Sequence, residues 1–401
     1  MTSHVRTEKK QIKINKSKVT ELQTKAGKVQ VWAEKELIDD DETKVLVKLT
    51  KLKHIFRNIV VLPDFHISGL LMNGSVFATK DFVYVNAIGG DIGCGMASVP
   101  LPIHSRDIEG KEQELYKLLH EAIPTGRQTK VEIPGHIDEH PVFRSGSQLL
   151  TTKVIKKLKQ QMGTIGDGNH FLEVQENDQG GLQLLVHTGS RYLGQLIKDY
   201  YIKHIADMQN NALHALEADS ELGTQFLADH DLAVLYAKEN RKEILRLALQ
   251  VLQRFLQVDM NIDGLLDSAT DIPHNFISKE EHGGETVFVH RKGAQKVEKG
   301  AAGIIPGDMG SATFMVEGKG YPLTFHSCSH GAGRKMARGK ALDTIDYEEF
   351  KESVKDIACR TDRNVLDEAP QAYKDIELVM KFQKEIVKIT DVFMPVINVK
   401  G

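Results

Sequence analysis

Residues 75–96 read SVFATKDFVYVNAIGGDIGCGM, a run of β-branched and aromatic residues that ends in a glycine-rich segment. β-Branched and aromatic side chains suit the pleated, half-buried surface of a sheet, so the first part predicts strand. The glycines of the second part indicate backbone that turns sharply or approaches a ligand closely. The same succession recurs elsewhere in the chain and decides the expected fold class.

Short strands are also predicted at VLVKLT (45–50), NIVVLP (58–63) and LQLLVHTGS (182–190). From 193 to 256 the pattern becomes helical. Apolar residues there recur at spacings of three and four, at Leu232, Leu235, Ile244, Leu247, Val251 and Leu252. We expect this segment to be a long helical insertion that packs on the outside of the sheet core.

After residue 271 the chain returns to strands and glycine-rich turns, and its tail from Tyr347 is mainly helical before a final strand-like MPVINVKG (394–401). No internal repeat or Pro/Ser-rich linker divides the sequence. It therefore predicts an α+β fold with a central β core, glycine-rich loops and one domain over residues 1–401.

The composition, 41% hydrophobic and 27% charged, is that of an ordinary soluble globular protein. The N-terminus has no apolar signal core, no run of 18 apolar residues suggests a membrane span, and the three cysteines are scattered. We expect a reduced, cytoplasmic protein without a membrane partner.

A net charge of −3 argues against nonspecific coating of nucleic acid but allows a local basic site. The basic cluster at Lys153–Lys159 is best interpreted as a solvated helix face. Two others, Arg291–Lys292 and Arg334–Lys340, adjoin glycine-rich segments, where contact with phosphate is the more plausible interpretation.

Asp91 and Cys94 are the first candidate metal ligands, three residues apart in the glycine-rich GGDIGCGM. A carboxylate oxygen and a thiolate sulfur together suit a borderline divalent metal. The alternative is a buried free cysteine in a tight turn, and the motif alone slightly favours it.

A second group follows in GDGNHFLE, where a glycine turn precedes Asn169, His170 and Glu173. His187 and His274 each lie beside a turn-forming or small polar residue, as expected of ligands. A single histidine is more often structural than a ligand, and the chain has 17 histidines. Together with Asp91 and Cys94, however, these histidines could hold two metal ions.

The segment SCSHGAGR places His330 beside Gly331, Gly333 and Arg334. Glycine backbone N–H groups and an arginine fork both bind phosphate oxygens. His330 could orient phosphate, act as a general acid or attack phosphorus itself. The alternative is a common glycine-rich lead-in to a helix. The residues alone therefore indicate metal-dependent phosphoryl chemistry with the substrate open.

With these motifs in hand, the sequence resembles the RtcB family of RNA-splicing ligases. The resemblance runs from Pro63–His66 (PDFH) to the terminal Lys400–Gly401. The motifs that carry it occur in family order: DIGCGM, GNHFLEV, HTGSR, HN, HRKGA, PGDMG, SHGAGR, AYKD and VKG. A chance match of so many ordered motifs is very improbable.

The resemblance implies a GTP- and Mn²⁺-dependent ligase that joins an RNA 3′-phosphate, or a 2′,3′-cyclic phosphate, to a 5′-hydroxyl end in tRNA splicing or RNA repair. It implies two manganese ions on Asp91, Cys94, His170, His187 and His274, with the thiolate bridging both. It implies nucleotide contacts from Asn169, Glu173, Arg334, Tyr373 and Lys400. His330 would carry GMP covalently and pass it to the RNA end, and Arg191 would meet RNA phosphate.

Three features depart from the family pattern. Asp167 stands in GDGNH, Asp308 stands in PGDMG where a small hydroxyl residue is common, and ISGLLMNGS (67–75) lacks the usual glycine-rich continuation. We expect Asp308 to contact the guanine or ribose of the nucleotide, and the departures suggest a divergent branch devoted to repair. Two alternatives remain: a cyclic-phosphate phosphoesterase with weak ligase activity, and a noncatalytic RNA- or ribosome-binding homologue.

Overall fold

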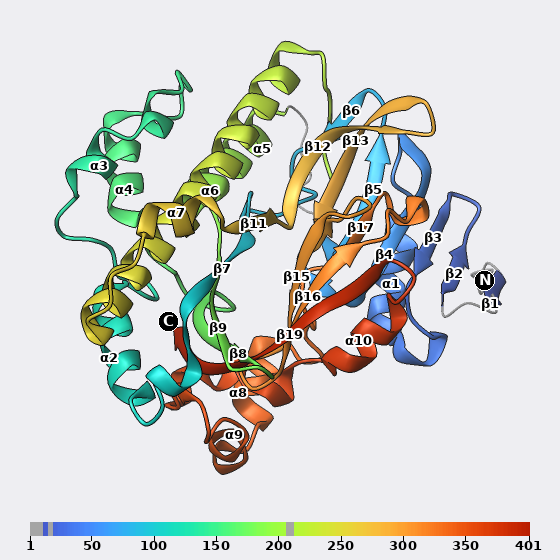
Figure 1. Cartoon of the computed structure of the whole chain (residues 1–401). Coiled ribbons are helices and arrows are strands. Elements are labelled where there is room, and N and C mark those ends of the chain that lie inside the picture. The colour runs from blue at the N-terminus through green and yellow to red at the C-terminus, as the bar shows by residue number, and fades with distance from the viewer. Residues whose placement is uncertain (1–10, 15–18, 206–211) are drawn as a thin grey trace.

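Two β-sheets form the centre of the molecule in the computed structural model, which describes residues 11–14, 19–205 and 212–401 (Figure 1). The first has seven strands, in the order β1 (Gln11–Ile14), β2 (Thr20–Gln23), β3 (Lys28–Val31), β4 (Ile55–Ser68), β5 (Leu71–Thr79), β13 (Glu285–Lys292) and β12 (Asn275–His282). All its neighbours are antiparallel except β3 and β4, which are parallel.

The second sheet follows the order β11 (Thr270–Pro273), β7 (Gly95–His104), β9 (Gly181–Thr188), β8 (Phe171–Asn177), β19 (Val387–Lys400), β16 (Thr313–Gly318) and β15 (Ala302–Pro306). Strand β18 (Ala358–Cys359) pairs in parallel with β19. Two small ladders pair β6 (Phe82–Tyr84) with β10 (Ala215–Glu217), and β14 (Ala294–Lys296) with β17 (Ser327–Ser329). The predicted terminal strand is therefore present, and it begins earlier than residue 394.

The helices lie around the two sheets (Figure 1). They are α1 (Asp40–Leu49), α2 (Glu112–Ala122), α3 (Gly135–Asp138), α4 (Thr152–Gln161), α5 (Tyr192–His204), α6 (Glu221–Leu256), α7 (Ile262–Asp267), α8 (Arg338–Thr344), α9 (Tyr347–Ser353) and α10 (Ile376–Phe382). Largely antiparallel sheets with helices outside them make an α+β fold, as the sequence predicted. Among the helices of the described residues, none is both long and apolar enough to cross a membrane.

In the described part of the segment predicted to be helical, 193–256, there are two helices with a strand between them, and residues 206–211 of that prediction lie outside the described residues. Helix α5 ends at His204, β10 pairs with β6, and α6 then runs to Leu256, the predicted end. The second half of α6 packs with α2 on the second sheet through an apolar cluster that includes Ile244, Leu249 and Leu252. Leu235, expected on the buried face, is 47% exposed.

The prediction of a strand at 45–50 is wrong, because these residues form the second half of α1. The preceding acidic residues determine the helix: the Asp39 side chain accepts a hydrogen bond from the Glu42 backbone N–H, and the Glu42 side chain accepts one from the Asp39 backbone N–H. This capping box starts the helix at Asp40. Leu46 and Leu49, three residues apart, then face the core, a spacing that suits a helix better than a strand.

The expectation of phosphate contact at Arg291 is also wrong. The Arg291 side chain is fully buried and bonds to the Glu280 carboxylate at 2.5 Å, the Ser327 hydroxyl and the Phe325 carbonyl. A buried guanidinium must be paired in this way, and its donors are therefore not free for a ligand. Lys292 is likewise buried and donates to the Leu71 carbonyl.

Candidate metal and nucleotide site

The pairing of three strands gathers the predicted metal ligands. Gly95 at the start of β7 pairs with Thr188 of β9 and Pro273 of β11. Cys94 and His274 lie next to these paired residues in sequence, and His187 lies within β9. His187 pairs with Phe171, the residue after His170. Ligands from four distant segments thus meet where these strands begin or end.

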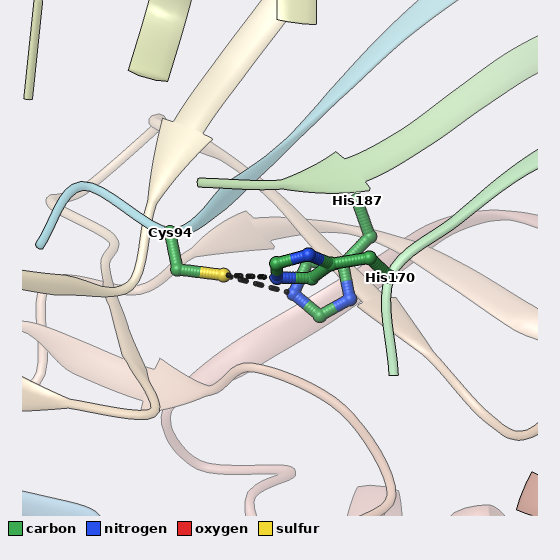
Figure 2. A group of neighbouring side chains, drawn as sticks. All are labelled: Cys94, His170 and His187. Carbon is green, nitrogen blue, oxygen red and sulfur yellow. Dashed lines mark hydrogen bonds between the residues drawn. The ribbon is translucent and has the colours of Figure 1, made fainter. Parts of the chain in front are cut away.

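Side-chain distances join the five predicted ligands into one cluster. The Cys94 Sγ atom lies 3.4 Å from His170 Nε2 and 3.3 Å from His187 Nε2, and all three ligand atoms lie within 4.8 Å of one another (Figure 2). Asp91 and His274 extend the cluster at its two ends, with Asp91 Oδ2 3.1 Å from His170 Nε2 and His274 Nε2 3.3 Å from His187 Nε2.

Backbone carbonyls set the tautomers of two of these rings. His170 Nδ1 donates to the Ile165 carbonyl at 3.1 Å, and His187 Nδ1 donates to the Asn169 carbonyl at 3.0 Å. Each Nδ1 therefore carries a proton, and each ring points its Nε2 toward Cys94. Ring nitrogens of metal-binding histidines are oriented in this manner by a hydrogen bond from the opposite nitrogen.

The electrostatics of the cluster also fit a metal. Burial lowers the pKa of His187 and His274 well below the usual value, so both rings are neutral ligands at neutral pH. Burial raises the pKa of the Cys94 thiol well above its usual value, and a bound cation would stabilise the thiolate. His274 Nδ1 is buried without a hydrogen-bond partner among the described residues, so no hydrogen bond from this nitrogen orients the ring as in His170 and His187.

His330 lies beside the cluster, with its ring centroid 4.8 Å from that of His274. Its Nδ1 is 2.6 Å from Asp64 Oδ2, and the same oxygen accepts its backbone N–H at 2.9 Å. Asp64 is fully buried on β4; burial opposes its ionisation, but the adjacent His330 outweighs it and lowers the pKa of the carboxyl. Nδ1 donates this hydrogen bond to the carboxylate, so Nε2 is the ring nitrogen of His330 that Asp64 leaves available to a ligand.

A glycine makes this approach of two segments feasible. Gly333 has φ +74°, and a Cβ there would collide with the carbonyl of Asp64. Asp64 belongs to the PDFH segment where the family resemblance begins, but no role was predicted for it from the sequence. The sequence feature that could have revealed its role is an acidic residue inside an otherwise apolar predicted strand, because a buried carboxylate requires a partner.

A cavity of about 570 Å³ opens beside His330 and His187. The six residues expected to hold a nucleotide all line it: Asn169, Glu173, Asp308, Arg334, Tyr373 and Lys400. The structure therefore brings these positions together next to His330 and the cluster of predicted metal ligands.

Glu368, which the sequence analysis missed, connects the cationic residues of this cavity. Its carboxylate lies 2.9 Å from Lys400 Nζ, 2.9 Å from Arg334 Nη1 and 2.8 Å from Arg338 Nη1. Burial alone would raise the pKa of Glu368, but these cations and the Tyr373 hydroxyl lower it to about 2. The sequence feature that could have identified Glu368 is its position five residues before Tyr373, in the segment that ends in the family motif AYKD.

The Arg334 guanidinium was expected to bind phosphate oxygens, but in the structure it is hydrogen-bonded to groups of the protein itself. It donates to Glu368, to the Asp367 carbonyl at 2.6 Å and to the Met336 carbonyl at 3.0 Å. These contacts occupy the guanidinium inside the protein. In this state Arg334 orients Glu368 and the cavity wall.

Glu173 and Asp308 are two further acidic residues that line the cavity. Burial raises the pKa of Glu173 to about 7, although Asn398 and Gln175 each donate to its carboxylate at 2.5 Å. Burial also raises the pKa of Asp308, whose oxygens accept the Gly310 N–H at 2.9 Å and the Ser311 hydroxyl at 2.6 Å.

Arg191 lies outside this cavity, at the N-terminus of α5. Its backbone has φ +54°, an uncommon conformation for a non-glycine residue. The guanidinium donates to the Thr164 hydroxyl and the Gly126 carbonyl, both at 3.3 Å. It thus packs on the loop whose Ile165 carbonyl orients His170.

Comparison with known proteins agrees with the motif order. A family profile described as "tRNA-splicing ligase RtcB" matches residues 45–152 and 135–401. The chain belongs to the RtcB family. The "RNA-splicing ligase RtcB" of Escherichia coli K12 is 33% identical over 95% of this chain and 99% of that protein. The "tRNA-splicing ligase RtcB" of Methanococcus maripaludis is 30% identical over 86% of this chain and 88% of its own length.

Proposed function

We propose that this RtcB-family protein is an RNA ligase that uses GTP and two manganese ions to join a 3′-phosphate or 2′,3′-cyclic phosphate end to a 5′-hydroxyl end. Its RNA would be a cleaved tRNA or another broken RNA in the cytoplasm. The observation that carries the proposal is the environment of His330. Its Nε2 is free while Asp64 holds Nδ1, between a five-ligand cluster and a cavity lined by cations.

The proposed metal ligands are Asp91, Cys94, His170, His187 and His274. Manganese bound there would supply a Lewis acid that neutralises phosphate charge. His330 Nε2 would attack the α-phosphorus of GTP, forming an N–P bond while the P–O bond to the β-phosphate breaks and pyrophosphate leaves with the electron pair. Nδ1 would keep its proton, and the Asp64 carboxylate that accepts its hydrogen bond would stabilise the positive charge on the ring.

Two transfers would follow. An oxygen of the RNA 3′-phosphate attacks the phosphorus of GMP, and the N–P bond breaks to return the lone pair to His330. The RNA 5′-hydroxyl then attacks the activated 3′-phosphorus, loses its proton and releases GMP. A cyclic phosphate would first be opened to a 3′-phosphate. Activation is needed because a 3′-phosphate without a leaving group is a poor electrophile.

The test is to incubate the protein with α-³²P-labelled GTP and MnCl₂ and to measure acid-labile, alkali-stable label on the protein. A ligase of this type is expected to accumulate protein–GMP and, with added RNA, to release GMP and joined product. A phosphoesterase would open cyclic phosphate without labelling, and a noncatalytic RNA-binding homologue would do neither. Either of those results would overturn the proposal.

Asp308→Ser is expected to retain protein–GMP formation and to reduce discrimination between GTP and ATP. Each Asp308 oxygen already accepts one hydrogen bond within its loop, and carboxylate oxygens have a further lone pair for an N–H of guanine or a ribose hydroxyl. The measurement is the ratio of labelling rates with GTP and ATP. The loss of one such contact corresponds to about 1 kcal/mol, or roughly fivefold in that ratio.

If Asp308→Ser binds GTP more tightly with the GTP/ATP ratio unchanged, the carboxylate acted by repelling phosphate. Ser311→Ala is the matched control, because it removes one of the hydrogen bonds that hold the Asp308 carboxylate while leaving that carboxylate in place.

A further inference from the structure

Helix α4 exposes lysines on one face. Lys153, Lys156 and Lys157 are exposed, while Leu158 is buried against the body of the protein. Positions i, i+3 and i+4 lie on the same side of a helix, so the three ammonium groups face solvent together. The helix contains no acidic residue. From the sequence alone we interpreted this cluster as an ordinary solvated helix face. The position of α4 in the fold indicates that the lysines could also contact a ligand of the candidate site.

Packing links this helix to the candidate site. α4 lies against α5 (Figure 1), and the Lys157 ammonium sits 3.4 Å from the centre of the Tyr192 ring. The Tyr192 backbone N–H donates to the Gln161 side chain at the end of α4. Arg191, the neighbouring residue, bonds to Thr164 in the loop that carries His170. Positive and aromatic groups therefore follow one another from exposed α4 to the edge of the metal cluster.

A second arginine flanks the same loop. Gly126, whose carbonyl accepts from Arg191 Nη2, is followed by the exposed Arg127. Two neighbouring lysines do not belong to this group, because Lys159 is paired with Asp138 at 2.6 Å and Lys130 with Glu243 at 3.1 Å. We call the group formed by Lys153, Lys156, Lys157, Tyr192, Arg191 and Arg127 the basic track.

We propose that the basic track binds the phosphate backbone of the RNA strand whose 3′-phosphate end reaches the metal cluster. This inference rests on the proposed function, since it takes the reacting end to lie at that cluster. Lysine and arginine bind phosphate without reading sequence. A ten-residue helix is about 15 Å long, so the track would contact several nucleotides upstream of the reacting end.

The test is the salt dependence of RNA binding by the manganese-loaded protein without GTP. The probes are a fluorescent unstructured RNA of 15 nucleotides and a trinucleotide, both with a 3′-phosphate, followed by anisotropy from 50 to 300 mM KCl. The double variant Lys153→Gln/Lys156→Gln is expected to weaken binding of the long RNA. Two lost contacts to a single strand should make the slope of log K against log [salt] shallower by about 1.4. The trinucleotide makes fewer phosphate contacts than the long RNA, so its slope should change less.

The matched control is Lys48→Gln/Lys117→Gln, which removes the same charge from exposed positions on α1 and α2. It should leave the slope at the wild-type value, because these two lysines change only the overall charge of the protein and contact no phosphate of the bound RNA. Equal slopes for all three proteins, or an equal decrease of the slope in both double variants, would show that the basic track does not bind the RNA backbone. Protein–GMP formation is assayed on the wild type separately. Its absence alongside a changed slope would refute the ligase proposal and leave the track standing.

Discussion

His330→Ala is expected to abolish protein–GMP formation, with a loss on the order of 10⁶-fold, the scale seen when a covalent nucleophile is removed. The reason is positional. Asp64 holds Nδ1 of the ring at 2.6 Å, which leaves Nε2 as the nitrogen available to attack beside the cluster of proposed metal ligands. Alanine removes the attacking atom while leaving the five proposed metal ligands intact. The measurement is radiolabel from GTP on the protein, together with manganese content.

Two variants sharpen this experiment. His326→Ala removes a histidine four residues earlier that contacts His282 rather than the cluster, and it should label like the wild type. Asp64→Asn keeps Nε2 but loses the charge that stabilises the ring cation, so labelling should fall without vanishing. Undiminished labelling of His330→Ala would show that another residue is the nucleophile.

The parts of the site that could be predicted from the sequence are those written in short motifs. Glycine next to a ligand-type side chain marked Cys94, His170 and His330, and the structure brings all three together. The register of β7, β9 and β11 that brings Cys94 beside His187 and His274 is a long-range property, and no local pattern specified it. The family resemblance supplied the grouping, because motif order implies a common fold.

The failures share a physical cause, which is that local patterns do not reveal partners distant in the chain. Arg291 next to a glycine suggested phosphate, but Glu280 on the neighbouring strand pairs with it in the core. Glu368 has an unremarkable sequence context and becomes central only when Lys400 and Arg338 converge on it. Residues 45–50 have strand-like composition, and the capping box at Asp39 and Glu42 outweighs that preference.

Cys94→Ser is expected to lose both manganese ions, whereas His274→Ala should lose only one. The geometry gives the reason: Cys94 Sγ lies in the middle of the cluster, within 3.4 Å of both His170 and His187. His274 lies at one end, with Nε2 3.3 Å from His187. A shared ligand affects every ion that it bridges, and a terminal ligand affects one.

Serine is a stringent replacement because it preserves size and removes the thiolate. A hydroxyl does not ionise near neutral pH, while a metal-bound thiol does. Loss of an outer-shell partner already weakens metal binding by roughly 10- to 100-fold, so loss of a bridging ligand should exceed about 100-fold. Manganese per protein is measured by atomic absorption after equilibrium dialysis. Cys328→Ser is the matched control, since Cys328 is buried in a different apolar cluster. Wild-type manganese content in Cys94→Ser would show that this cysteine is only part of the core, and equal losses in Cys94→Ser and His274→Ala would rule out the bridging role.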